Sequence, residues 1–107
     1  MEELSILYET VARRKQQPEA GSYTSYLFEK GEEKILKKVG EECTEVIIAS
    51  LNQTKDDLIN EYGDLFYHLI VLMVEKGVTL DEVAAELARR SGKTHNLKAE
   101  RREITNY

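Results

Sequence analysis

The segment from Leu65 to Val74 constrains the fold most, because it is apolar at nearly every position and His68 alone interrupts it. The run is about half as long as the roughly 20 residues that a membrane span needs, so we expect a buried helix and no membrane partner. A helix that is apolar on all sides must be covered on all sides. A chain of 107 residues offers few other helices for this task. We therefore expect a homodimer or a higher homo-oligomer to complete the core.

Helical periodicity also runs through most of the remaining chain. The first segment has apolar residues at the i, i+3, i+4 and i+7 positions of one helix face, namely Leu4, Leu7, Tyr8 and Val11. Further helices are predicted over about 32–51, 55–75 and 80–91. Their ends are indicated by two threonine N-caps and a glycine C-cap, at Thr54, Thr79 and Gly77.

Two segments lack this periodicity. Residues 21–28 are polar and aromatic, and we expect them to form an irregular loop with a functional role. Residues 93–107 are polar, and we expect a flexible tail or a short extra helix. The sequence shows no strand-like alternation. The prediction is an all-α fold, a bundle of four to five helices over residues 1–92, completed by homodimerisation.

Composition narrows the class of protein. Lys and Arg number 15 against 20 Asp and Glu, a net charge of -5, which argues against nucleic acid as a partner. The one cysteine, Cys43, excludes an internal disulfide and a multi-cysteine zinc site, and we expect it in the core. The acidic start at Glu2 and Glu3 is unlike a signal peptide, so a cytoplasmic protein is expected.

Acidic residues gather on two of the predicted helices. Glu41, Glu42 and Glu45 share one arc of the second long helix, at about 100° per residue, and Glu42 borders its apolar side. Glu61 and Asp64 share a polar stripe with His68 on the following helix. Two antiparallel helices joined by a short turn would bring these stripes together.

Such faces are usually solvated surface, and Glu–Lys pairs at helical spacing are common. Here the acidic groups adjoin the most apolar segment of the chain, where burying a carboxylate costs several kcal/mol without a compensating charge. A divalent cation supplies that charge. Carboxylate ligands favour Mg²⁺, with Mn²⁺ as a substitute, and such ions prefer substrate phosphates as remaining ligands. The predicted metal ligands are Glu42, Glu45, Glu61 and Asp64.

The acidic pattern Glu41-Glu42-x-x-Glu45 followed by Glu61-x-x-Asp64 resembles that of all-α nucleoside-triphosphate pyrophosphohydrolases of the MazG type. The surrounding motifs resemble those of the phosphoribosyl-ATP pyrophosphatase family, which acts in the second step of histidine biosynthesis. These motifs are Ser22-Tyr23-Thr24-x-x-Leu27, Gly31, Lys38-x-Gly40-Glu41-Glu42 and Asp64-Leu65-x-Tyr67-His68. The resemblance covers roughly residues 1–91.

The resemblance implies Mg²⁺-dependent hydrolysis of 1-(5-phosphoribosyl)-ATP to 1-(5-phosphoribosyl)-AMP and pyrophosphate. Phosphoryl transfer needs positioning and charge neutralisation more than a protein nucleophile, so water is the expected nucleophile. Glu41 and Glu45 are the candidate general bases. The candidate substrate-binding residues are Tyr23, Thr24, Lys34, Lys38 and His68.

Each of these residues also has a structural interpretation. Lys38 could simply pair with Glu42 one turn later, and Tyr23 could hold its loop against the bundle. His68 could orient a metal ligand from the second shell instead of contacting substrate. Two other functions stay open for the whole chain: a house-cleaning pyrophosphohydrolase for other nucleoside triphosphates, or a non-catalytic helical dimerisation module.

Overall fold

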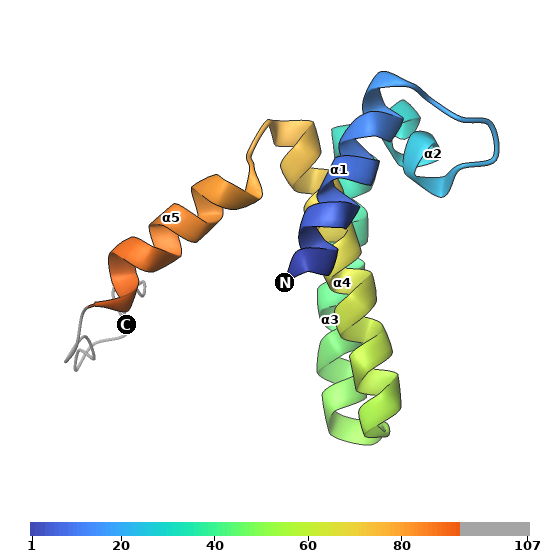
Figure 1. Ribbon diagram of the computed structural model, residues 1–107. Helices are drawn as coiled ribbons and strands as arrows, with labels where there is room; N and C mark the ends of the chain where they lie inside the picture. The colour runs from blue at the N-terminus through green and yellow to red at the C-terminus, as the bar shows by residue number, and fades with distance from the viewer. Residues whose placement is uncertain (93–107) are drawn as a thin grey trace. The chain divides into compact units, whose positions relative to one another are not determined.

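Two long helices, α3 (Glu32–Asn52) and α4 (Lys55–Lys76), pack against each other as an antiparallel hairpin (Figure 1). The predicted threonine cap forms the turn between them. Thr54 Oγ1 accepts a hydrogen bond from the Asp57 amide at 3.2 Å, and the Asp57 carboxylate accepts one from the Thr54 amide at 3.3 Å. This reciprocal capping box satisfies donors that the first turn of a helix leaves unpaired. At the other end, Gly77 closes α4 in the predicted left-handed conformation, with φ 73°.

The computed structural model describes residues 1–92, and over that range it contains helices and no strands. The remaining helices are α1 (Glu2–Gln16), α2 (Tyr23–Lys30) and α5 (Leu80–Ser91). The all-α prediction is therefore confirmed, and the predicted tail 93–107 lies outside the described residues. None of the helices described in this part of the chain is long and apolar enough to span a membrane. The chain divides into two compact units, residues 1–77 and the part that starts at Val78.

In the first unit, α1 packs against α4 and α2, and α2 packs against α3. Figure 1 shows that α1 and α2 lie beside one half of the hairpin, whereas the half that carries the α3–α4 turn extends beyond them. Six apolar side chains are buried here: Val11, Leu27, Ile35, Ala49, Ile70 and Val71. This small core fixes the half of the hairpin on which α2 sits.

The prediction of an irregular loop over residues 21–28 is wrong, because most of it forms α2. Ser22 caps this helix, and its Oγ accepts a hydrogen bond from the Ser25 amide at 3.1 Å. Leu27 anchors the helix in the core, and Gly31, with φ 95°, ends it. Eight residues make only about two turns, which is too short for an apolar stripe to be recognised. The serine cap and the terminal glycine were the available signals.

Apolar side chains that the first unit leaves exposed form one arc on each helix of the hairpin. We call these the apolar arcs; they comprise Leu36, Ile47 and Leu51 of α3, and Ile59, Tyr62, Phe66 and Leu69 of α4. Cys43 lies in the α3 arc and is exposed, so its predicted place in the core is wrong for the single chain. Phe66 and Leu69 belong to the segment for which we predicted incomplete cover.

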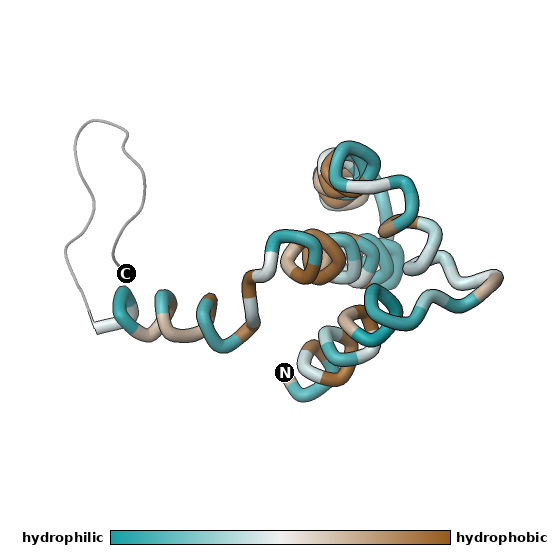
Figure 2. The backbone as a smooth tube through the Cα atoms, turned by 90° about the horizontal axis from the view of Figure 1, so that it is seen from above, coloured by the Kyte–Doolittle hydropathy of each residue, from teal (hydrophilic) through white to brown (hydrophobic). Residues whose placement is uncertain are grey.

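The second unit contains α5, which begins with the other predicted capping box. Thr79 Oγ1 accepts from the Glu82 amide at 3.1 Å, and the Glu82 carboxylate accepts from the Thr79 amide at 2.9 Å. Hydrophobic and hydrophilic segments alternate within the turns of this helix in Figure 2. Hydrogen bonds from Arg89 and Arg90 lower the pKa of Glu86 to about 2, so its carboxylate is ionised at neutral pH.

Candidate functional site

Three predicted metal ligands converge where α3 and α4 face each other. Glu42 of α3 meets Glu61 and Asp64 of α4, and each contributes a carboxylate oxygen to a set that lies within 4.8 Å of one another. Glu61 and Asp64 are three residues apart, so they lie on one face of α4, and the antiparallel hairpin turns that face toward α3. We call these three residues the carboxylate cluster.

Burial makes the cluster unusual for an acidic helix face. Glu42 is only 8% exposed, and its Oε2 atom is buried without a hydrogen-bond partner among the described residues. An ionised carboxylate oxygen without a partner is costly in the interior, and two further carboxylates nearby increase that cost. An all-oxygen donor set of this kind fits a hard divalent cation such as Mg²⁺. The unsatisfied atom therefore points to a missing positive charge.

The pKa of Glu61 reflects the same crowding of carboxylates. Partial burial raises the pKa of Glu61, and the negative charges of Glu45, Asp64 and Glu42 raise it further. Glu45 is thus close enough to act on the cluster, although its oxygens do not belong to the 4.8 Å group. The structure brings three of the four predicted ligands together, and the ligand role of Glu45 stays a prediction.

His68 lies one helical turn after Asp64 on α4. It is buried, and its Nδ1 donates a hydrogen bond to the backbone carbonyl of Asp64 at 2.7 Å. Because a carbonyl can only accept, Nδ1 carries the hydrogen, and Nε2 of the neutral ring can accept from the hydroxyl of Tyr23 at 3.1 Å. A buried polar pair of this kind fixes the ring orientation. His68 therefore connects Asp64 to the first residue of α2.

A second hydrogen bond runs parallel to the first. The hydroxyl groups of Thr24 and Tyr67 are hydrogen-bonded to each other, so Tyr23 and Thr24 of α2 pair with the consecutive residues His68 and Tyr67 of α4. Burial raises the pKa of Tyr67, whereas the bond to Thr24 opposes that change. Sequence reasoning gave Tyr67 no role, although a hydroxyl within an apolar run is a signal for such a buried contact.

The lysines differ in their relation to the cluster. Lys38 lies 3.4 Å from Glu41, and burial disfavours its charge, but Tyr23, Glu41 and Glu42 outweigh that effect and raise its pKa. Lys38 is therefore an ammonium ion at neutral pH, placed beside the acidic groups. Lys34 has no hydrogen bond or ion pair to the cluster in the described part of the chain.

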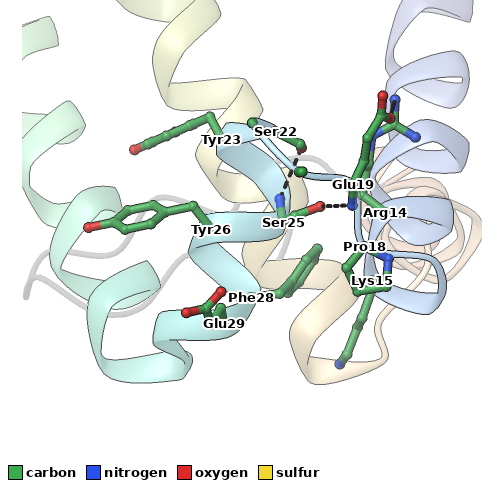
Figure 3. Close-up of a pocket in the computed structure, with 12 residues that line it drawn as sticks. Arg14, Lys15, Pro18, Glu19, Ser22, Tyr23, Ser25, Tyr26, Phe28 and Glu29 are labelled. Atoms are coloured by element: carbon green, nitrogen blue, oxygen red, sulfur yellow. Dashed lines mark hydrogen bonds and ion pairs between the residues drawn. The ribbon is translucent and has the colours of Figure 1, made fainter.

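A pocket of about 920 Å³ lies between α2 and the end of α1 (Figure 3), within the size range of ligand sites. Its cations are already paired: Arg14 with Glu19 at 2.7 Å, and Lys15 with Glu75 at 3.2 Å. Figure 3 shows the ring of Tyr26, a wall residue, pointing the same way as Tyr23 and away from Arg14. Sequence reasoning assigned Tyr26 no function, because nothing in the spacing distinguishes it from a residue that only packs.

Comparison with known proteins places this arrangement in a family. Residues 4–91 match the family described as phosphoribosyl-ATP pyrophosphohydrolase. A relative from Listeria welshimeri is 59% identical over 101 residues, covering 94% of this chain and 96% of its own. One from Clostridium acetobutylicum is 55% identical over 103 residues, covering 96% and 94%, and one from Lactiplantibacillus plantarum is 53% identical over 106 residues, covering 99% of both chains. All three are named phosphoribosyl-ATP pyrophosphatase.

The raised pKa of Glu61 leads to a stability prediction for the metal-free protein. A raised pKa means that the folded chain binds this proton more tightly than the unfolded chain. The resulting stabilisation is complete at pH values below the pKa that Glu61 has in the unfolded chain. It is lost as the pH rises through the pKa that Glu61 has in the folded chain. At pH 7 the charge of Glu61 therefore opposes folding, and Glu61→Gln should raise the melting temperature in EDTA.

The measurement is thermal unfolding in EDTA between pH 4 and pH 7. The Glu61→Gln protein should lose less stability than wild type as pH rises across that range, whereas Glu9→Gln, an exposed change on α1, should follow the wild-type curve. A Glu61→Gln protein that melts below wild type at pH 7 would contradict the account of crowded charges.

Proposed function

The chain belongs to the phosphoribosyl-ATP pyrophosphohydrolase family, and we propose that it hydrolyses 1-(5-phosphoribosyl)-ATP between the α and β phosphates. The products are 1-(5-phosphoribosyl)-AMP and pyrophosphate, which is the second step of histidine biosynthesis, carried out in the cytoplasm. The observation that carries this proposal is the buried, unpartnered oxygen of Glu42 within a cluster of three carboxylates. The names of the relatives favour phosphoribosyl-ATP over other nucleoside triphosphates.

We assign Mg²⁺, with Mn²⁺ as a substitute, to Glu42, Glu61 and Asp64, with Glu45 as a further ligand. When bound, the ion would neutralise charge on the triphosphate and lower the pKa of a water molecule. The position of the cluster between two packed helices supports this assignment, since both helices hold their ligands without a mobile loop. His68 positions the start of α2 beside Asp64, because its ring is bonded both to the Asp64 backbone carbonyl and to the Tyr23 hydroxyl.

The other acidic and basic residues have roles around the phosphates. Water is the nucleophile, and no covalent intermediate forms. Either Glu41 or Glu45 orients this water and accepts its proton. Glu41 is half exposed and paired with Lys38, whereas Glu45 acts electrostatically on Glu61, so both remain candidates. The Lys38 ammonium is available to pair with a phosphate oxygen by leaving Glu41.

The remaining candidate substrate-binding residues lie at different distances from the carboxylate cluster. Tyr23 and Thr24 hold the start of α2 beside the cluster, and we propose that they contact the substrate from there. His68 is buried, which favours its positioning role over direct contact with substrate. Lys34 is one turn before Lys38 on α3, where its side chain would meet a phosphate farther from the metal.

We also propose that the active form is a homodimer or a higher homo-oligomer built on the apolar arcs. The exposed fractions are 61% for Ile47, 76% for Leu51 and 57% for Ile59, and these residues lie close to the α3–α4 turn. Exposed apolar surface of this extent is typical of an interaction site. A second copy would cover both arcs and complete the core.

Asp64→Asn tests the metal assignment. The amide keeps the size of the side chain but removes a charged ligand, so we expect the rate of pyrophosphate release to fall by about 100-fold or more at saturating Mg²⁺. Asp56→Asn makes the same chemical change at an exposed position in the first turn of α4 and should keep the wild-type rate. Circular dichroism would show that both variants are folded. Normal turnover by the Asp64→Asn protein would exclude Asp64 as a required ligand.

Ile47→Asp tests the oligomer. A charge in the centre of the α3 arc cannot be buried against a second copy without a large desolvation cost, so the variant should elute as a monomer. Ser5→Asp adds the same charge at an exposed position on α1 and should leave the mass unchanged. Light scattering during size-exclusion chromatography measures this mass. A wild-type protein that is already monomeric would refute the oligomer.

A further inference from the structure

Two exposed tyrosine rings are stacked on each other on α2, and the first of them, Tyr23, lies close to the carboxylate cluster. The ring centroids of Tyr23 and Tyr26 are 6.0 Å apart with an angle of 24° between the ring planes. Tyr67 continues the row, with its centroid 6.1 Å from that of Tyr23 and an angle of 29°. Tyr23 is 46% exposed and Tyr26 is 40% exposed, so the row is open to solvent at the α2 end.

The row is held at a defined place relative to the cluster. The Tyr23 hydroxyl is bonded to His68, which in turn is bonded to the carbonyl of Asp64. Figure 3 shows the rings of Tyr23 and Tyr26 extending in the same direction, away from Arg14 and Lys15. An exposed aromatic surface is thus attached, through two hydrogen bonds, to a proposed metal ligand.

We propose that Tyr23 and Tyr26 form a platform on which the purine ring of the nucleotide stacks while its phosphates reach the carboxylate cluster. This inference rests on the proposed function, because it takes the substrate to be a nucleotide with a purine base. The two rings are stacked with 24° between their planes, and a base that lies on the Tyr26 ring, in the place of the Lys30 ammonium, would extend this stack. Stacking of a base on an aromatic side chain is a recurrent source of affinity in proteins that bind single-stranded nucleic acids.

The chemistry of the substrate adds a reason for tyrosine. Attachment of a sugar at N1 makes adenine a stronger base, so the alkylated ring carries positive charge more readily than the ring of ATP. A positively charged ring is attracted to the electron-rich face of tyrosine. The Lys30 ammonium lies over the Tyr26 ring, 5.8 Å from its centroid, and an entering base would displace this flexible side chain, which can then pair with the phosphate on the added sugar. The platform would therefore favour the phosphoribosylated purine over an unmodified one.

The absence of tryptophan from the sequence allows a direct test. Tyr26→Trp introduces a single tryptophan into the platform, which can be excited selectively over the tyrosines, and a base that stacks on it should quench its emission. The probe is 1-(5-phosphoribosyl)-AMP with Mg²⁺, a product that is not consumed. Pyrophosphate together with ribose 5-phosphate serves as the probe without a base. Ile6→Trp, exposed on α1, provides the control fluorophore.

We expect 1-(5-phosphoribosyl)-AMP to quench Tyr26→Trp, and the probe without a base to have no effect. AMP should quench only at higher concentration, and Ile6→Trp should respond to none of them. Absence of quenching by 1-(5-phosphoribosyl)-AMP, or equal quenching by the probe without a base, would overturn the platform. Because this test reads binding and not turnover, a chain that fails to release pyrophosphate would refute the proposed function separately.

A kinetic arm separates stacking from a merely structural role. Tyr26→Leu should raise KM for 1-(5-phosphoribosyl)-ATP about tenfold with a smaller change in kcat, since it removes the ring face but not the cluster. Tyr26→Phe keeps the face and should raise KM less than Tyr26→Leu does. A fall in kcat at constant KM for Tyr26→Leu would assign Tyr26 to the support of α2 and overturn its contact with the base.

Discussion

The mutual repulsion of three carboxylates at a helix–helix contact is the constraint on which this molecule depends. Glu42 is buried between α3 and α4, and Glu61 and Asp64 face it from the opposite helix. In a metal-free chain this arrangement opposes folding, and the raised pKa of Glu61 is its local consequence. The hairpin tolerates it because capping, packing and the small core stabilise the two helices independently of the site. A site that is unfavourable when empty is well suited to bind a cation.

The surrounding elements keep this contact in place. α2 is short, yet its first two residues are hydrogen-bonded to consecutive residues of α4, just beyond Asp64. The same two residues are the ones we propose to contact the substrate, so these hydrogen bonds place the proposed substrate-binding side chains beside the carboxylate cluster. The same hairpin leaves its apolar arcs exposed, and this exposure is the reason for proposing that a second copy of the chain covers them.

Much of this architecture could be predicted because it depends on local chemistry. The capping boxes at Thr54 and Thr79 and the left-handed Gly77 are encoded within four residues each, and all three were confirmed. The convergence of Glu42 with Glu61 and Asp64 followed from helical spacing and a short turn. These features need no knowledge of distant parts of the chain.

The features that were missed depend on tertiary context. α2 has only eight residues, so its formation depends on a serine cap and one buried leucine and not on a periodic apolar pattern. Cys43 lies on an apolar arc that the single chain leaves exposed. Helical periodicity identifies an apolar face, but it does not tell whether that face packs against another part of the same chain. Tyr23 and Tyr26 are three positions apart, but Tyr67 is more than forty positions away from both, and no spacing rule connects it with them.

Thermal unfolding of wild type and Glu42→Gln with increasing Mg²⁺ tests the central claim most directly. At about ten times the dissociation constant, a bound ion should raise the wild-type melting temperature by about 5–10 °C. Glu42→Gln, which loses the buried charge, should melt higher than wild type without Mg²⁺ and gain little from its addition. Equal responses of the two proteins to Mg²⁺, or no response of wild type with and without nucleotide, would contradict a cation site at this contact.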